Sequence, residues 1–211
     1  MTHSTALLSR LYPGMNLGKT DPETHKVAEE LVFGFWVFLM SDAVLFALLF
    51  AVYETMTAGT AGGPGAAQLF HLKSTLIETL ILLTSSFTFG MASLLMKHKR
   101  QVGWLQIMLL VTLTLGLAFL AMEISDFTKM VQQGAVPQTS GFLSAFYVLV
   151  STHFLHVLSG CIWILVMVIQ LSVFGLDETV KTRLLRLGIF WHFLDIVWIF
   201  IFTFVYLLGL L

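Results

Sequence analysis

The sequence predicts an all-helical integral membrane protein with five transmembrane helices. Three observations support this: 57% of the 211 residues are hydrophobic, only 11% are Asp, Glu, Lys or Arg, and the hydrophobic residues gather in long uninterrupted runs. A soluble domain is roughly half apolar and about a quarter charged, so this much apolar surface needs a bilayer as its solvent. The net charge of −1 gives no basic footprint for nucleic acid, and the N-terminal segment lacks the pattern of a cleaved signal peptide.

The apolar runs are long enough to cross a membrane, because about 20 residues at about 1.5 Å each cover roughly 30 Å of hydrocarbon. They extend over residues 31–53, 74–96, 102–122, 141–174 and 187–211, and none contains more than one charged residue. Helix is the required form, since lipid offers the backbone no hydrogen-bond partners. The fourth run is longer than a span needs and should tilt or project beyond the lipid. Residues 1–30 are predicted to form a polar tail, and the other connections are short.

Basic residues are distributed unevenly between the two ends of the predicted helices. Nine of the eleven Lys and Arg residues lie in the tail, the second connection and the fourth connection, all on one side, and only Lys73 and Lys129 lie on the other. Positive residues stay preferentially in the cytoplasm. The sequence therefore predicts a cytoplasmic N-terminus and, because the number of spans is odd, a periplasmic C-terminus.

Six ionisable side chains lie inside the predicted spans, where each costs roughly 2.5–3.5 kcal/mol on insertion scales. They are Asp42, Glu78, His153, His156, His192 and Asp195. Groups of this kind face other helices and mark packing contacts or functional sites. We take these six residues as a candidate packing or lipid-binding set, and no residue is assigned a catalytic, cofactor-binding or metal-binding role.

The depth of these residues predicts one contact between the last two spans. Asp195 lies about 12 Å into the fifth span from the cytoplasmic side, and His153 lies about 12 Å from the same side. His156 shares a helix face with His153. A hydrogen bond from Asp195 to His153 or His156 is therefore expected. Glu78 lies only about 6 Å below the opposite edge; it pairs with a loop, contacts a lipid headgroup, takes up a proton or is a simple packing carboxyl.

Three other interpretations are open from the residues alone. His153 and His192 on facing helices have the residue type of a pair of haem ligands, which would make the chain a haem b-binding membrane anchor or electron-transfer subunit. His153, His156, His192 and Asp195 together could hold a metal ion, although helix packing explains the spacing equally well. A proton-coupled transporter needs polar midplane groups and broken helices; Asp42 lies near the midplane, but no span contains proline.

Three strings in the spans resemble a known family. The first span contains FGFWVFLMSDAVLF, the fourth SGFLSAFYVLVSTHFLHVLSGCIW and the fifth FWHFLDIVWIFIFTFVYLLG. With Glu78 in TLIETLILLTSS, they are similar to subunit III of the haem–copper respiratory oxidases over residues 31–211. Five spans instead of seven, and the GTAGGP loop, most resemble the short form of bacterial bo-type ubiquinol oxidases. Subunit III of a cytochrome c oxidase is the alternative within the family.

The resemblance implies an accessory subunit without catalytic residues in a proton-pumping quinol oxidase of the bacterial inner membrane. In this family the haems and copper belong to subunit I, against which subunit III packs in a complex with the other oxidase subunits. Subunit III is expected to hold phospholipid and to support proton uptake and complex stability. By position, Glu78 matches the family's intramembrane glutamate, and His153, His156, His192 and Asp195 match its polar packing set.

Overall fold

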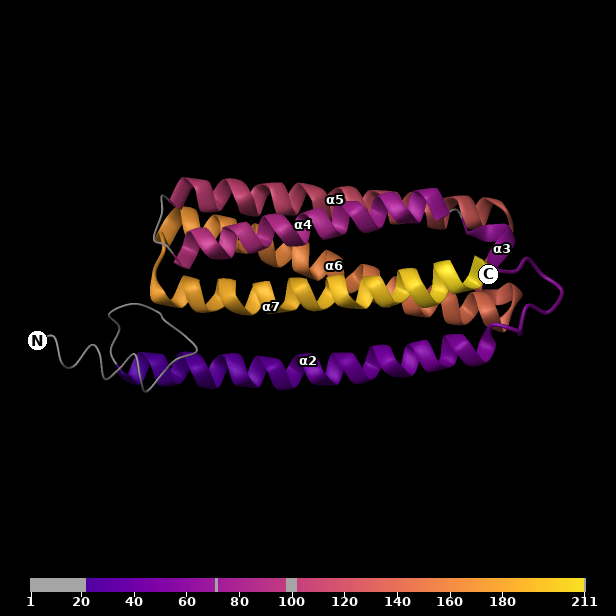
Figure 1. Cartoon of the computed structure of the whole chain (residues 1–211), viewed down its shortest axis with the longest axis horizontal. Coiled ribbons are helices and arrows are strands. Elements are labelled where there is room, and N and C mark those ends of the chain that lie inside the picture. The colour runs from indigo at the N-terminus through magenta and orange to yellow at the C-terminus, as the bar shows by residue number, and fades with distance from the viewer. Residues whose placement is uncertain (1–21, 71, 98–101, 211) are drawn as a thin grey trace, which may run out of the picture.

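The first long helix lies to one side of the others. The computed structural model describes residues 22–70, 72–97 and 102–210. In Figure 1, α2 (Pro22–Met56) runs alongside the remaining long helices, and its main contacts are to α6 and α7. Only 11% of its most apolar window is buried, against 33–39% in the other four candidate spans. Most of the surface of α2 is therefore not covered by the rest of the chain.

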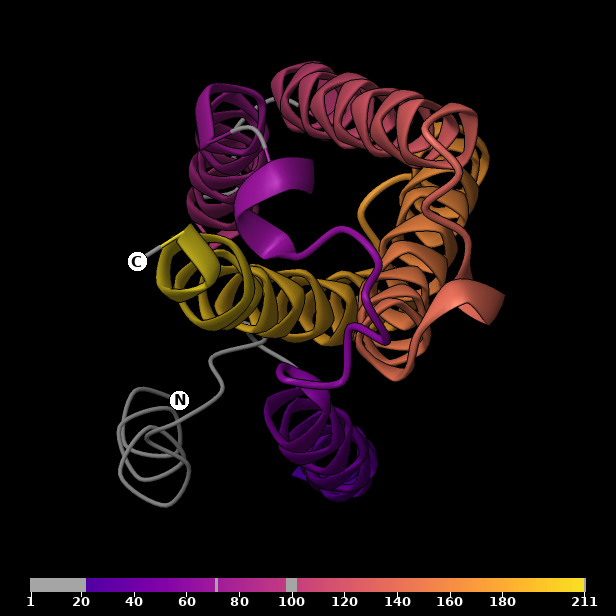
Figure 2. The ribbon, with the colours of Figure 1, turned by 90° about the vertical axis from the view of Figure 1, so that its right-hand side faces the viewer.

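The other four long helices form a four-sided bundle (Figure 2). They are α4 (Leu72–Lys97), α5 (Val102–Gln132), α6 (Gly141–Phe174) and α7 (Glu178–Phe200). Contacts join α4 to α5, α5 to α6, α6 to α7 and α7 back to α4, which closes the ring. Short connections make successive members antiparallel. The short helix α3 (Ala66–Leu69) lies over one end of the ring, and η1 (Pro137–Thr139) connects α5 to α6.

The last span changes helix type near its end. α7 passes directly into the π-helix η2 (Ile201–Leu207), which is followed by the 3-10 helix η3 (Leu208–Leu210). A π-helix bonds each N–H to the carbonyl five residues back and is rare beyond a single turn. The hydroxyl of Tyr53 on α2 donates to the carbonyl of Val205 at 3.5 Å, so this segment also fastens α2 to the bundle.

A large side chain fits against two glycines at the centre of the ring. Trp191 on α7 is 1% exposed. A Cβ atom added to Gly160 on α6 would lie 2.9 Å from Cζ3 of Trp191, and one added to Gly116 on α5 would lie 2.9 Å from Cη2. Carbon atoms prefer a separation of about 3.5–4.0 Å. The indole therefore occupies space that is free only because the facing residues of two neighbouring helices are glycines.

The described part of the chain contains five helices that are long and apolar enough to span a membrane, as predicted, and α6 covers the same residues as the fourth apolar run. Two helices are longer than the predicted spans: the third helix continues past Met122 to Gln132, and the fifth begins at Glu178, ahead of residue 187. Both added stretches carry charged side chains, which end an apolar run without ending a helix. The first helix likewise begins at Pro22, inside the expected tail, where proline suits the first helical turn. Residues 1–21 and the basic connection at 98–101 lie outside the described residues.

Candidate functional site: polar groups between the helices

Two tryptophans of α7 form hydrogen bonds to α4. Nε1 of Trp191 donates to Oγ of Ser85 at 3.1 Å, and Nε1 of Trp198 donates to Oγ1 of Thr79 at 3.0 Å. The tryptophans are seven residues apart, so they lie on one face of the helix. All four side chains are buried, and these bonds set the register of α4 against α7.

His153 is fully buried between α6, α5 and α7, as part of an aromatic cluster. Its ring stacks on Trp198 with 5.3 Å between centroids and forms T-shaped contacts with Phe119 and Phe46. Neither ring nitrogen has a hydrogen-bond partner among the described residues. The last two spans touch, as predicted, but His153 joins them through ring stacking.

Asp195 is buried on α7 and faces a histidine of its own helix. Its Oδ2 lies 3.7 Å from Nδ1 of His192, and that nitrogen is hydrogen-bonded to Oγ of Ser86 on α4 at 2.7 Å. Neither oxygen of Asp195 has a hydrogen-bond partner among the described residues. The predicted hydrogen bond from Asp195 to His153 or His156 is therefore wrong.

His156 instead faces α2. Its Nε2 lies 3.7 Å from Oδ2 of Asp42, while its Nδ1 lies 2.7 Å from the backbone carbonyl of Thr152. One turn further along α2, the ring of Phe46 packs against the ring of His156, with 5.2 Å between the two ring centroids. Asp42 and Phe46 thus belong to the contact that holds α2 against α6.

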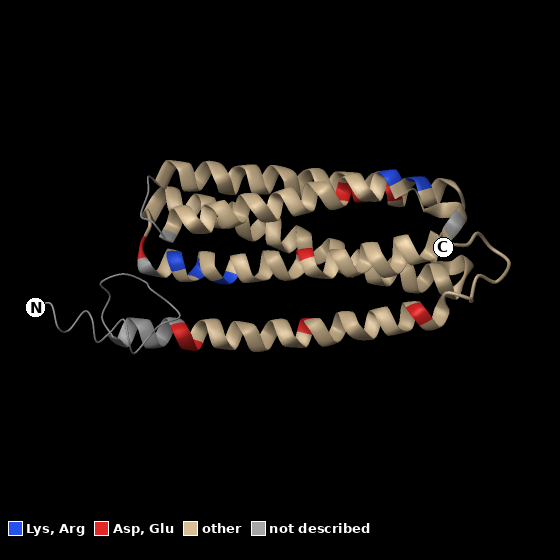
Figure 3. Cartoon of the chain, viewed as in Figure 1, with Lys and Arg blue, Asp and Glu red and all other residues tan. Residues whose placement is uncertain are grey.

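Carboxyl groups gather where the beginning of α4 lies beside the end of α5. Figure 3 shows acidic and basic residues side by side there, near the end of the bundle that carries the C-terminus. Oγ of Ser74 donates to Oδ2 of Asp126 at 3.0 Å, and Nζ of Lys129 donates to Oδ1 of Asp126 at 2.6 Å. Glu78 and Glu123 are both buried close by. The sequence reasoning missed Glu123 because the apolar run ends at Met122. The spacing of Glu123, Asp126 and Lys129 at intervals of three was an available sign that the helix continued.

These polar groups do not form the alternative centres considered from the sequence. Among the described residues, no group of three or more His, Cys, Asp and Glu side chains has the geometry to hold a metal ion. His153 packs in the aromatic cluster while His192 faces Ser86 and the edge of Phe89, so the two imidazoles do not face a common space for a haem.

The fold and these contacts define a multi-pass helical membrane protein whose intramembrane polar groups contribute to helix packing. Residues 16–210 match the family model of cytochrome c oxidase subunit III, and the chain belongs to this family. The resemblance seen in the sequence is thereby confirmed.

The curated relatives include subunits of quinol oxidases. The chain is 48% identical over 190 residues to the cytochrome bo(3) ubiquinol oxidase subunit 3 of Pseudomonas putida, which covers 89% of this chain and 90% of that protein. For the same subunit of Pseudomonas aeruginosa the identity is 46% over 209 residues, with 99% and 100% covered. The quinol oxidase subunit 3 of Bacillus subtilis is 43% identical over 182 residues, with 85% and 87% covered. These names favour the quinol oxidase branch over the cytochrome c oxidase alternative.

Proposed function

We propose that this chain is subunit III of a proton-pumping quinol oxidase and acts there as an accessory subunit. The observation that carries the proposal is the 46% identity to the Pseudomonas aeruginosa subunit over 99% of this chain and 100% of that protein, because a likeness along both whole chains implies the same set of interfaces. In this proposal subunit I holds the haems and copper, and this chain supports proton uptake and the stability of the complex.

A partly exposed imidazole on α7 supports a protein partner inside the membrane. The side chain of His192 is 45% exposed on α7, although it lies in the middle of an apolar helix. A polar ring facing lipid is unfavourable, and a second protein that covers it with a polar group removes that cost. We assign this contact to subunit I, which would cover the face shared by α7 and α4 around Ser86.

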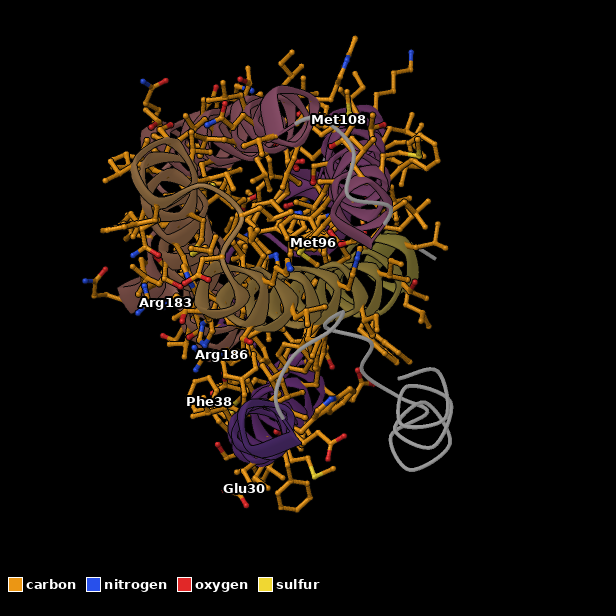
Figure 4. All side chains as sticks on the ribbon, turned by 90° about the vertical axis from the view of Figure 1, so that its left-hand side faces the viewer. Glu30, Phe38, Met96, Met108, Arg183 and Arg186 are labelled. Atoms are coloured by element: carbon orange, nitrogen blue, oxygen red, sulfur yellow. The ribbon has the colours of Figure 1, made fainter. Side chains whose placement is uncertain are left out.

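Basic side chains at the opposite end from the C-terminus support the expected bound phospholipid. Nη1 of Arg183 donates to Oε1 of Gln170 on α6 at 2.8 Å, while Nε of Arg186 is buried without a partner among the described residues. Figure 4 looks at this end and shows Arg186 between α7 and α2, on the side of Phe38. A lipid phosphate near this guanidinium would supply an acceptor for Nε of Arg186, with its acyl chains along the exposed apolar side chains of α2.

Co-purification tests the assembly proposal. An affinity tag on this chain should recover a larger subunit that contains haem, in equal amount, from the bacterial inner membrane. A haem spectrum that stays with this chain after the other subunits have been dissociated would instead establish the haem-binding anchor. Recovery of the chain without any haem-bearing partner would contradict the proposal.

The charge distribution supports a cytoplasmic N-terminus and a periplasmic C-terminus. Residues 1–30, the last of which belong to α2, would then form the polar segment ahead of the membrane domain. Cysteine labelling tests this orientation, because the single native cysteine, Cys161, is buried and does not compete. Ala58→Cys lies in the connection after α2, and Asp177→Cys lies between α6 and α7; both positions are exposed. In intact cells a membrane-impermeant maleimide should label position 58 and spare position 177. The opposite pattern would reverse the orientation.

A further inference from the structure

Two carboxyl groups are buried between α4 and α5, and the accessory role leaves them unexplained. Glu78 is 1% exposed and Glu123 is 2% exposed. Oε1 of Glu78 and Oε2 of Glu123 have no hydrogen-bond partner among the described residues. An isolated ionised carboxylate is very costly to bury, and such a group usually becomes neutral by keeping a proton.

The register of the two helices places these carboxyls at one level. Ser74 on α4 bonds to Asp126 on α5, and Thr88 on α4 bonds to Thr112 on α5 at 2.8 Å. The two bonds are fourteen residues apart on both helices, so the antiparallel register is constant between them. Glu78 lies four residues inward from Ser74, or about 6 Å, and Glu123 lies three residues inward from Asp126, or about 4.5 Å.

Nearby charges do not neutralise the pair. Glu123 interacts electrostatically with Glu78 and with Asp126, both of which are acidic. Among the described residues, two lysines lie at this end of α4 and α5. Lys129 interacts electrostatically with Glu78 but is bonded to Asp126, and its side chain is 54% exposed. Lys73, at the start of α4, is exposed. Among the phenols, Tyr206 on η2 interacts electrostatically with both glutamates, while Tyr147 on α6 donates its hydroxyl to the carbonyl of Ala135. The histidines of α6 and α7 and Asp195 face the other contacts described above. The acidic groups also lack the geometry of a metal site among the described residues. A proton is the cation that fits.

A small cavity lies one helical turn outward of this level, at the end of the bundle that carries the C-terminus. Its volume of about 20 Å³ accommodates one water molecule. Polar side chains of Thr75, Asp126, Lys129, Gln133 and Tyr206 line it. Thr75 and Asp126 are each one helical turn from the two buried glutamates, on the outward side. The cavity therefore lies on the outward side of the carboxyl pair, where a water molecule would be one helical turn from both glutamates.

We propose that Glu78 and Glu123 form one proton-binding site, in which a single proton is held between the two carboxyl groups and exchanges through water in the adjacent cavity. A hydronium in the cavity gives its proton to a carboxylate oxygen and leaves as water, so the charge of the pair falls from two negative charges to one. The hydrogen bond formed between carboxylic acid and carboxylate is of the short, charge-assisted kind. This site goes beyond the accessory role and does not depend on it.

Infrared spectroscopy tests the pair directly, because the carbonyl stretch of a protonated carboxyl is separate from that of a carboxylate. The sample is the full chain purified from its native membrane with the partners that accompany it, in wild-type form and as Glu78→Gln and Glu123→Gln. Glu54→Gln is the control, since Glu54 is an exposed carboxyl on α2, near the end of the bundle at which the pair also lies. Spectra of each variant are subtracted from the wild type across a pH titration.

Two interacting carboxyls take up protons in two separated steps that belong to the pair. The protonated-carboxyl band that differs between wild type and Glu78→Gln should therefore titrate in two steps in the wild type and in the Glu54→Gln control. Glu78→Gln should show only one protonation step, that of the remaining Glu123. If Glu123→Gln fails to assemble, the comparison of Glu78→Gln with the wild type decides the test. Identical titrations in the wild type and Glu78→Gln, or no protonated band at any pH where the protein stays folded, would overturn the pair.

The route through the cavity has its own test. Thr75→Val preserves the shape of the side chain and removes its hydroxyl from the cavity wall. After transfer into deuterium oxide, the carboxyl band should shift more slowly in Thr75→Val than in the wild type. An equal exchange rate would overturn the assignment of the cavity as the route.

Discussion

The contact between Trp191 and Gly160 predicts a measurable cost for adding one methyl group. In Gly160→Ala the new Cβ would lie 2.9 Å from Cζ3 of Trp191, so the ring must recede by about 0.6–1.1 Å to reach a favourable carbon–carbon distance. An adjacent edge of the same ring abuts α5 at Gly116, which blocks an easy retreat. Overpacking of this kind costs roughly 1–3 kcal/mol.

A matched variant separates this cost from the backbone effect of the substitution. Replacing a helical glycine with alanine stabilises a helix by roughly 0.5–1 kcal/mol. Gly90→Ala on α4 carries the same change where a Cβ would meet nothing within 4 Å. The difference between the two variants therefore isolates the overpacking, and Gly160→Ala should be less stable than Gly90→Ala by about 1–3 kcal/mol.

The measurement is the free energy of unfolding in mixed detergent micelles, titrated with sodium dodecyl sulfate and followed by circular dichroism. A second background tests the mechanism: Trp191→Phe shortens the ring, and in it Gly160→Ala should lose most of its cost, since residues in contact show interaction energies of about 0.5–3 kcal/mol. Equal stability of Gly160→Ala and Gly90→Ala would refute the reasoning. The reasoning would also be refuted if Gly160→Ala lowered the stability by the same amount in the wild type and in the Trp191→Phe background.

The same assay checks three further expectations. Phe46→Ala removes a buried ring from the contact between α2 and α6 and should cost about 3–5 kcal/mol, whereas Phe33→Ala, on an exposed position of the same helix, should have little effect; similar losses would contradict the described docking of α2. Trp198→Phe removes the hydrogen bond to Thr79 and should cost at least about 1 kcal/mol, with wild-type stability counting against that bond. Asp195→Asn should change stability by less than about 1 kcal/mol because Asp195 makes no hydrogen bond to α6, and a loss of several kcal/mol would restore the original His–carboxylate prediction.

The error about Asp195 shows what depth along a helix leaves open. Rise per residue placed Asp195 and His153 at one level, but their orientation around the helix axes decides what they face. Asp195 precedes Trp198 by three residues, which at 3.6 residues per turn leaves an offset of about 60°. Trp198 occupies the inward position and stacks on His153, and Asp195 is turned toward His192. The sequence predicted that α6 and α7 touch, while the choice of partner depended on which large ring filled the interior.

The arrangement of α2 was equally inaccessible to pattern reasoning. Its most apolar window has a mean hydropathy of 2.3, the same as that of α5, yet 11% of the first window and 33% of the second are buried. Hydropathy measures compatibility with lipid and says nothing about neighbours. The burial of Glu123 was missed for a related reason, because a search for apolar runs stops at the first charged residue even where a buried helix face continues.

The π-helix η2 gives the last span a tolerance to changes in length that the other spans lack in the part of the chain that the structure describes. Adding or removing one residue in an ordinary α-helix rotates everything beyond it by about 100°, which would turn a packed face away from its neighbours. A π-helical turn contains about one residue more than an α-helical turn, so deleting a single residue within Ile201–Leu207 would let α7 continue as an α-helix and still deliver Leu208–Leu210 in their present orientation. Natural variation in the length of the fifth span should therefore concentrate in this segment.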